Sequence, residues 1–544
     1  MFVLHLSRQL DFFIKVIEAR FKEAHPLAKI ILGVGLLALL IIQGLLHVIV
    51  LFFYPSATSF AHLHKMQPAV GYKVSFIEHN NWLRRLKVGS TSALVVVAFL
   101  TTIVNILFLT AQPAYAVVRT WDGGGGVDTN WGTCANWSDN TCPTSSDVAT
   151  FDATSTNNVI IATTLTGSTA PAGIDINTGY TGIITQNVGV SITVGSSGYD
   201  QADGTFMGGN SAINVGNIIL SGGSFTSTSG TLTVTGNFDN SGGGAFEPNN
   251  GIVAFTTGDD TINVNSTETF ANLVINASAS TKTISDSDTL TVTGILTLTD
   301  GSINQTTVPD AGTIVVQGSI SHASTFDGGN ARVNLEGSAT ASFSGGYMSG
   351  FKLNSASAVA TGNTSGTLTF EQAVTIAAGT FNAGDGAVTV GSGVLFTVSG
   401  GTFNGGAGTV TMNGGVTISG GAFNGGTLTV FFCNSCTFTL SGGTLAPGSG
   451  TLKVGGNWTQ TDGVFTEGTS TVWFYRSGSP TIDVNSTETF YKLTFDGLSG
   501  WTKTIANNDT LYVSNNLILA DLLLSQTTIP AAGTIAASGN VTVE

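Results

Sequence analysis

One phrase is written four times in succession, as GTFNAGDGAVTV (379–390), GTFNGGAGTVTM (401–412), GAFNGGTLTV (421–430) and GTLAPGSGTLKV (443–454). Each version joins a glycine-rich turn to a short segment in which apolar residues alternate with threonine, the pattern of a strand with one buried face. A period of about 21 residues built from such units is typical of a solenoid, in which successive repeats stack as coils. We therefore predict an all-β fold, a right-handed parallel β-helix.

One large apolar residue follows the turn in each repeat. Stacked coils place equivalent residues above one another, so these side chains should form an internal ladder whose burial stabilises the coil. The predicted ladder comprises Phe206, Phe225, Phe246, Phe381, Phe403, Phe423 and Phe465, with Leu445 in the place of a ring between the last two. With about 21 residues per coil, the chain after Ala116 provides roughly 20 coils, and residues 157–544 carry the repeats.

Charge divides the chain near residue 116. Ten of the 18 Lys and Arg residues lie at or before Lys87, together with only four of the 33 Asp and Glu residues. The part after Ala116 therefore holds eight basic and 29 acidic residues. A basic, apolar front indicates membrane association, and an acidic remainder rich in Gly, Thr and Ser indicates export. Because the acidic part repels phosphate, we expect no binding to nucleic acid.

The front of the chain consists of α-helical membrane segments. Residues 1–29 are amphipathic and suit an interfacial helix, and residues 30–54 form an apolar run long enough to span a bilayer. A basic loop, 55–91, follows. Five Lys or Arg residues precede the span and five lie in the loop, so the positive-inside rule does not fix the orientation. Translation from Met66 instead of Met1 would leave a long signal peptide and no first span.

The second apolar segment, 92–116, has the layout of a signal peptide. Basic residues precede the run, and AQPAYA ends it with Ala114 and Ala116 in the small-x-small arrangement that signal peptidase accepts. We expect cleavage between Ala116 and Val117, which would place the repeats outside the cell. The alternative is an uncleaved second transmembrane helix.

All four cysteines lie after the predicted cleavage site, as Cys134 with Cys142 and Cys433 with Cys436. Even numbers of locally paired cysteines in an exported chain favour disulfides. The CNSC spacing also admits a redox or zinc site, but zinc would need two further ligands and a redox site would need a helix start. The sequence around Cys433 is strand-like, so we predict a disulfide that closes a turn.

The two ends of the repeat region differ. Residues 117–156 hold three tryptophans and the first cysteine pair, and we predict that they cap the first coil, which would otherwise expose a strand edge. A sugar-stacking platform is the alternative role for these tryptophans. A module of about sixty residues occurs twice, at 261–320 and 481–540, and lengthens the coil. The last coil is open, so self-association through it is expected.

The cap carries the one family resemblance. The matching residues are Trp121, Gly123, Asn130, Trp131, Asn136, Trp137, Pro143 and the segment Asp147 to Phe151. This spacing resembles the start of autotransporter-type and related β-helical bacterial surface repeat proteins. The resemblance implies a right-handed parallel β-helix at the cell surface, often in adhesion.

Catalysis and metal binding find weak support. Asp259 with Asp260 and Asp286 with Asp288 are the best carboxylate pairs for a polysaccharide lyase or hydrolase, but corner residues of a coil also have this pattern. The lone histidine after Ala116, His322, has no evident catalytic setting.

Glycine–aspartate loops at 123–128 and 384–386 resemble those of calcium-binding β-rolls, yet their aspartates do not recur in register, so only incidental calcium is expected. We assign no catalytic, cofactor-binding or metal residues.

The sequence therefore predicts a non-catalytic surface β-solenoid, membrane-targeted through its front, with a structural or adhesive role. Its partners would be surface glycans or other cells, met through rows of Thr, Asn and Ser. A carbohydrate-active β-helix enzyme and a surface-layer or sheath subunit are the alternatives.

Overall fold

The computed structural model describes residues 116–305, 312–338, 340–427, 429–433, 435–475, 479–496, 502–520, 523–526 and 533–544. All of them belong to one of the two compact units of the chain, Pro113–Glu544. The predicted segments 1–29, 30–54 and 55–91, and all of 92–116 except its last residue, lie outside the described residues. In the part that is described, no helix has the length and apolar character needed to cross a membrane.

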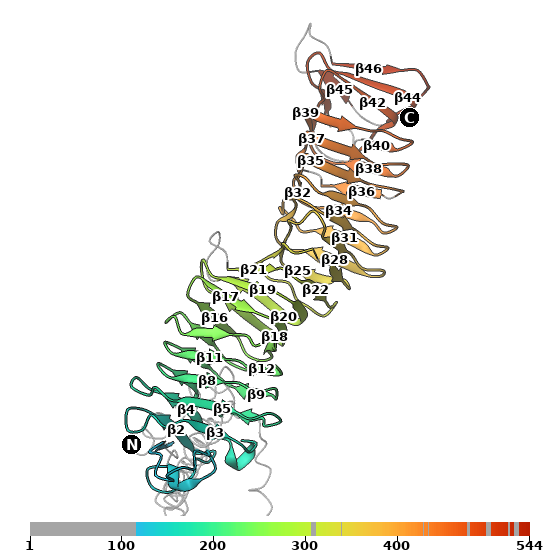
Figure 1. Cartoon of the computed structure of the whole chain (residues 1–544). Helices are drawn as coiled ribbons and strands as arrows, with labels where there is room; N and C mark the ends of the chain where they lie inside the picture. The colour runs from blue at the N-terminus through green and yellow to red at the C-terminus, as the bar shows by residue number, and fades with distance from the viewer. Residues whose placement is uncertain are drawn as a thin grey trace, which may run out of the picture. The chain divides into compact units, whose positions relative to one another are not determined.

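The described residues form an all-β, parallel β-solenoid of about 17 turns (Figure 1). One turn contains three short strands, such as β10 (Ile218–Leu220), β11 (Ser224–Thr226) and β12 (Thr231–Val234). Each of them pairs in parallel with the strand one turn later, as β10 does with β13, β11 with β14 and β12 with β15. Backbone hydrogen bonds therefore run between turns, which is what defines a solenoid.

The strands gather into three sheets of 31, five and eleven members. The first part of the largest sheet comprises β1 (Val117–Thr120), β2 (Asp147–Phe151), β4 (Gly173–Ile176), β6 (Ile192–Thr193), β7 (Gly198–Gln201), β9 (Ile213–Val215), β10, β12, β13 (Phe238–Asn240), β15 (Ile252–Phe255), β16 (Asp260–Val264), β17 (Thr267–Phe270), β18 (Asn272–Ile284), β19 (Thr289–Val292), β20 (Ile295–Gln305), β21 (Thr313–Val316), β22 (Ser319–His322), β23 (Arg332–Leu335) and β24 (Thr340–Phe343). Its second part comprises β26 (Gly350–Leu353), β27 (Val359–Thr361), β29 (Val374–Ile376), β30 (Thr380–Asn382), β32 (Phe396–Val398), β33 (Thr402–Asn404), β35 (Val416–Asn424), β37 (Phe438–Ala446), β39 (Trp458–Phe465), β41 (Thr481–Asp483), β43 (Thr502–Ile505) and β45 (Leu523–Gln526).

The two smaller sheets cover one side of the stack each. The five-stranded sheet comprises β3 (Val159–Ile161), β5 (Ile183–Gln186), β8 (Thr205–Met207), β11 and β14 (Ala245–Glu247). The eleven-stranded sheet comprises β25 (Gly346–Met348), β28 (Thr367–Phe370), β31 (Ala387–Val390), β34 (Val410–Met412), β36 (Thr429–Phe432), β38 (Thr451–Val454), β40 (Thr471–Phe474), β42 (Thr487–Asp496), β44 (Thr510–Ala520), β46 (Thr534–Ala537) and β47 (Asn540–Val543). Two short 3₁₀ helices, η2 (Cys134–Asn136) and η3 (Gly167–Thr169), lie near the start.

The turn count is lower than the roughly 20 coils expected, because several turns are longer than 21 residues. Val117 on β1 pairs with Asp147 on β2, a step of 30 residues, and Asp175 pairs with Asp200, a step of 25. The repeats with the clearest sequence period are the shortest turns. A period measured on them alone overestimates the number of coils.

Alternation within the strands builds the core. In β12 and β31 the threonines face outward and are partly exposed, whereas the aliphatic residues between them are buried. Threonine is β-branched and favours strands, so it can hold the extended backbone from the outer face. Glycine is required at the corners: Gly421 has a φ of +63°, and a Cβ there would lie 2.0 Å from the carbonyl oxygen of Gly401 in the turn below.

The ladder residues form two stacks in different sheets. Phe206, Phe225 and Phe246, on β8, β11 and β14, stack nearly parallel with ring centroids 4.9 and 6.0 Å apart. The second stack belongs to the largest sheet and consists of Phe381, Phe403 and Phe423, with centroids 5.7 and 4.7 Å apart, followed in register by Leu445 and Phe465. The sequence period places one ring in each turn but does not say which side of the turn carries it.

On one side of the stack the ladder of strands is interrupted between β20 and β25. Two isolated parallel bridges, Gly301 to Phe326 and Asp327 to Tyr347, join these turns, in place of the three- or four-residue pairings found elsewhere. On the other two sides the pairing continues, from β21 to β23 and from β22 to β24.

Candidate binding surface

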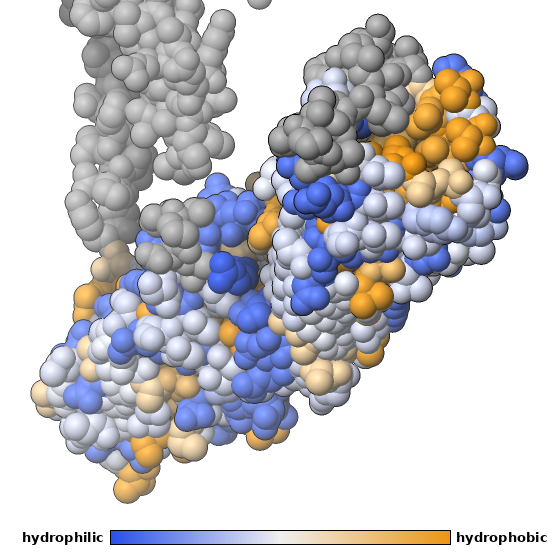
Figure 2. All heavy atoms as spheres, turned by 90° about the horizontal axis from the view of Figure 1, so that it is seen from above, coloured by the Kyte–Doolittle hydropathy of each residue, from blue (hydrophilic) through white to orange (hydrophobic). Residues whose placement is uncertain are grey.

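The outer surface of the solenoid is mainly polar. Figure 2 shows one face on which most side chains are pale or blue, with hydrophobic residues mostly in small separate groups. On the eleven-stranded sheet, Thr369, Thr389 and Thr411 occupy one outward row on β28, β31 and β34. Such rows arise because the pairing is in register, so each outward position lies directly above the same position of the previous turn.

Further along, the same row changes its chemistry. Phe431 on β36, Lys453 on β38 and Trp473 on β40 follow Thr411 in register, and Thr494 on β42 comes next. The neighbours of these three residues within each strand are buried, so the three side chains project outward. Two aromatic rings with a lysine between them therefore interrupt a threonine row.

The lysine lies against the rings. The Lys453 ammonium is 4.8 Å from the Phe431 ring centroid and 4.3 Å from that of Trp473, within the range of a cation–π interaction. Tyr475, two residues after Trp473, lies edge-on to both rings, with centroid distances of 6.3 Å to Phe431 and 6.1 Å to Trp473. We refer to Phe431, Lys453, Trp473 and Tyr475 as the aromatic–lysine cluster.

The surroundings of the aromatic–lysine cluster are polar. A parallel outward row contains Thr429, Thr451 and Thr471 and then Lys492, whose ammonium is 5.8 Å from the Tyr491 ring centroid. In the part of the chain that the structure describes, the indole N–H of Trp473 has no hydrogen-bond partner. The cluster thus combines flat apolar faces, hydroxyl groups and a cation.

The second disulfide lies at one edge of this surface. Cys433 directly follows β36, and its backbone N–H donates to the carbonyl oxygen of Met412 in the turn below. It pairs with Cys436, with the Cα atoms 5.4 Å apart, and Cys134 pairs with Cys142 at 4.5 Å. Both disulfides predicted from sequence are confirmed. The Cys433–Cys436 link fixes the corner next to Phe431.

A second row is made of asparagines. The amide Nδ2 of Asn404 donates to Asn382 Oδ1, and that of Asn424 donates to Asn404 Oδ1, each at 2.9 Å. These side chains directly follow the rings of the second stack in sequence and are only partly exposed. The bonds link three turns and leave few amide groups for a ligand, so this row stabilises the coil.

The acidic pairs considered for catalysis are engaged in the fold. Asp260 forms an ion pair with Lys282, and Asp259 accepts a hydrogen bond of 2.8 Å from the Thr281 backbone N–H. Asp288 is buried and accepts a 2.8 Å bond from the N–H of Val264 in the turn below. Each of these three carboxylates holds a corner between two turns. Asp286 is exposed beside them.

The remaining candidates are also structural or isolated. His322 is buried, its Nε2 is 2.8 Å from the Tyr347 carbonyl oxygen, and burial lowers the pKa of its imidazole. Asp385 lies exposed in its glycine loop, and Asp128 accepts from Asn130 and Thr133 within its own loop. Among the described residues, no three His, Cys, Asp or Glu side chains are placed to hold a metal ion.

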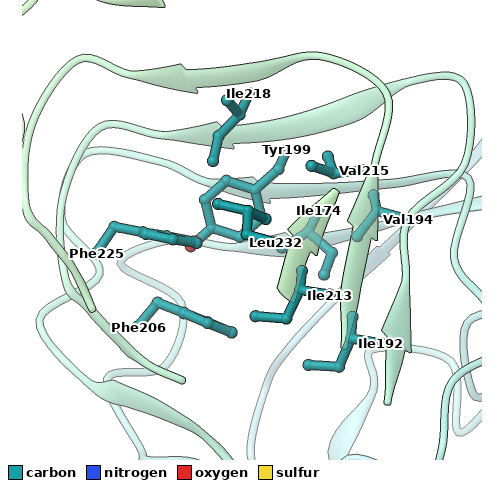
Figure 3. Close-up of a pocket in the computed structure, with 10 residues that line it drawn as sticks. All are labelled: Ile174, Ile192, Val194, Tyr199, Phe206, Ile213, Val215, Ile218, Phe225 and Leu232. Carbon is teal, nitrogen blue, oxygen red and sulfur yellow. The ribbon is translucent and has the colours of Figure 1, made fainter. Parts of the chain in front are cut away.

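The interior offers no ligand site of useful size. One small void of about 10 Å³ lies near the first aromatic stack, where Phe206, Phe225 and Tyr199 converge with aliphatic side chains (Figure 3). The Tyr199 hydroxyl donates to Gln201 Oε1 at 2.7 Å. A space this small and apolar is a packing defect rather than a pocket, since it holds at most one water.

The tryptophans of the N-terminal segment are buried, which excludes a sugar-stacking platform there. Trp121, Trp131 and Trp137 are at most 2% exposed and surround Phe151, with ring centroids 6.1, 5.8 and 5.7 Å from it. Trp137 Nε1 donates to the Trp131 carbonyl oxygen at 2.9 Å. This aromatic block covers the first full turn, while β1 adds one further strand to β2.

At the predicted cleavage site, Ala116 and Val117 are exposed and Ala114 lies outside the described residues. Comparison with known protein families, with curated proteins and with solved structures finds no match to this chain. The class that the geometry defines is a parallel β-solenoid with a polar outer surface and one outward aromatic–lysine cluster.

Proposed function

We propose that this chain is an exported surface protein whose β-solenoid has a structural and adhesive role without catalysis. The front segments direct it to the membrane, and cleavage before Val117 releases the repeat region to the outside. Outward rows of side chains then meet surface glycans or other cells. Each contact is weak, and the stack multiplies it.

The single observation that carries this proposal is the register of the outer rows. Because successive turns pair residue by residue, Thr369, Thr389 and Thr411 repeat the same group at the spacing of the turns, about 4.8 Å. A regular row of hydroxyl groups suits a repeating polymer, since one contact geometry can recur along both partners. The carboxylates that a hydrolase would use hold corners instead.

Three further features belong to the proposal. The hand of the coil is right-handed, as parallel strand connections almost always are. The likeness of the cap sequence to autotransporter-type surface proteins supports an outside location. Two disulfides support an oxidising compartment, where such bonds persist.

Mass spectrometry on intact cells tests the location. Cells producing the full chain are treated with an impermeant protease, and the N-terminus of the remaining protein is sequenced. We expect a mature terminus at Val117 and loss of the repeat region on protease treatment. A chain that keeps residues before Val117 and survives the protease would overturn the proposal.

A further inference from the structure

We propose that the aromatic–lysine cluster is the binding site for an acidic glycan. This inference rests on the proposed function and makes it specific: it assigns the ligand class and the residues that hold it. A sugar ring would lie against the aromatic faces of Trp473 and Tyr475, while a carboxylate of the glycan would meet the ammonium groups of Lys453 and Lys492.

The first argument is the break in the threonine row. Strand positions equivalent to Phe431, Lys453 and Trp473 are threonine on the three turns before them and on the turn after them. Threonine serves the fold at this position, so the coil does not need the rings. Placing two partly exposed aromatic side chains on an outer face costs solvation, and a ligand that covers them recovers it.

The second argument is the combination of groups. Aromatic rings are amphipathic contact surfaces and lie here beside the hydroxyl groups of Thr451 and Thr471. A sugar needs both, because its ring carries apolar C–H faces and a hydroxyl-bearing edge. Asp496, at the end of β42, adds a hydroxyl acceptor on the same sheet. A protein partner would instead favour a continuous apolar patch with a polar rim.

The third argument is charge. Only eight basic residues accompany 29 acidic residues after Ala116, yet Lys453 and Lys492 lie on one sheet, two turns apart. An acidic polymer is repelled by most of this surface and attracted here, so the surrounding negative charge confines binding to the cluster. In the sequence these lysines stand 39 residues apart, which hides their proximity.

The rings also hold Lys453 ready for the ligand. Contact with Phe431 and Trp473 restricts the flexible lysine side chain before binding, and restricted side chains lose less entropy when a ligand arrives. The disulfide at Cys433 stiffens the adjoining corner. The cluster is therefore organised in advance.

Titration calorimetry tests the inference on the full-length chain purified in detergent. The probe is polygalacturonate, a linear acidic glycan, and its methyl-esterified form is the neutral comparison. The variants Trp473→Thr and Phe431→Thr restore the threonine of the row, and Lys453→Thr removes the central cation. Tyr347→Thr is the matched control, because Tyr347 is a half-exposed aromatic residue of the same row with no lysine between rings.

We expect the wild-type chain to prefer polygalacturonate over its ester. Trp473→Thr should weaken binding at least tenfold, Lys453→Thr should abolish the preference for the acidic form, and Tyr347→Thr should leave affinity unchanged. Equal binding of the ester, no binding of polygalacturonate, or binding that survives all three cluster substitutions would overturn the inference. Circular dichroism of each variant checks that the coil is intact.

Failure here and failure of the proposed function are distinguishable. The protease experiment reports location independently of any ligand. A surface-exposed chain that ignores acidic glycans would defeat this inference alone, whereas cluster-dependent binding by a chain protected inside the cell would defeat only the surface role.

Discussion

The two copies of the duplicated module, 261–320 and 481–540, share one set of buried carboxylates but differ at a buried lysine. In the first copy the Val264 N–H donates to Asp288 at 2.8 Å, and in the second the Val484 N–H donates to Asp509 at 2.7 Å. In both, the carboxylate belongs to the turn above the corner that it holds. Burial raises the pKa of both carboxyls, against the opposing effect of these backbone hydrogen bonds.

A second carboxylate recurs at the same corner. Glu268 accepts from Asn240 at 2.5 Å and Glu488 accepts from Gln460 at 2.6 Å, so even a changed donor keeps the bond. The residue before each TETF segment has a positive φ, +70° for Ser266 and +72° for Ser486. A corner in that conformation turns backbone N–H groups inward, and buried donors require acceptors. The carboxylates therefore follow from the backbone.

The lysines do not share a partner. Lys282 is fully buried, forms an ion pair with Asp260 and donates to the carbonyl oxygens of Thr257 and Gly258. At the position of Asp260 the second copy has Pro480. Burial lowers the pKa of Lys503 there, while Asp496 acts in the opposite direction. The comparison shows that corner geometry is repeated strictly, whereas charge compensation inside the coil is solved separately in each copy.

Replacing the lysines by methionine should separate the copies most strongly. Lys282→Met leaves the Asp260 carboxylate and two carbonyl groups without their donor, so we expect a local loss of about 3–5 kcal/mol. Lys503→Met removes a charge that burial already disfavours, and a loss of roughly 1 kcal/mol is expected.

Hydrogen exchange with mass spectrometry measures both losses in peptides that cover β18 and β43. Equal losses in the two copies would show that the Asp260 pair contributes nothing specific. The wild-type chain under the same conditions supplies the reference for each peptide.

Removing the shared carboxylates should affect the copies equally. Asp288→Ala and Asp509→Ala each leave a buried backbone N–H without an acceptor, at a cost of about 1–3 kcal/mol. The exposed Asp385, replaced by alanine, is the control and should change stability little. Local exchange rates at Val264 and Val484 report the effect. A large difference between the two variants would mean that the corners are not equivalent.

The smallest effect is on pH dependence. Burial raises the pKa of the Glu268 and Glu488 carboxyls, so the folded chain binds protons more readily than the unfolded chain just above their ordinary pKa. Their ionisation therefore lowers stability as pH rises through that window, and acidification towards pH ~4.5 restores it.

The double variant Glu268→Gln with Glu488→Gln lacks these two ionisations. Its thermal midpoint should change less between pH ~7 and ~4.5 than that of the wild type, with a difference of about 1 kcal/mol or less in stability. His322, whose lowered pKa opposes the trend, is present in both chains and cancels. Parallel pH profiles would contradict the assignment.

The repeat period predicts the solenoid, because each coil must bury its apolar face on the next. It does not predict sidedness. Phe225 and Phe403 occupy similar phrases, yet one belongs to the five-stranded sheet and the other to the largest sheet. The choice depends on turn lengths summed over many coils, and one uncertain corner shifts all later residues to another side. Local pairing, such as that of Cys134 with Cys142, was within reach of the sequence.

The aromatic–lysine cluster was missed for a similar reason. Its residues are about 20 apart in sequence, and only the register of β36, β38 and β40 brings them together. A usable signal existed: TVFF, TLKV and TVWF place a ring or a lysine at the third, outward position of a strand where other repeats have threonine. The acidic pairs failed as a signal because corners and active sites use the same side chains.

The interruption between β20 and β25 has a consequence for how the molecule melts. Each turn of a stack is held only by its two neighbours, so cooperative unfolding spreads as far as neighbouring turns remain well joined. Here one of three sides offers isolated bridges at Phe326 and Asp327 instead of a ladder. Heat can therefore dismantle the block before β20 and the block after β25 as separate events, and a calorimetric trace with two transitions would mark this seam.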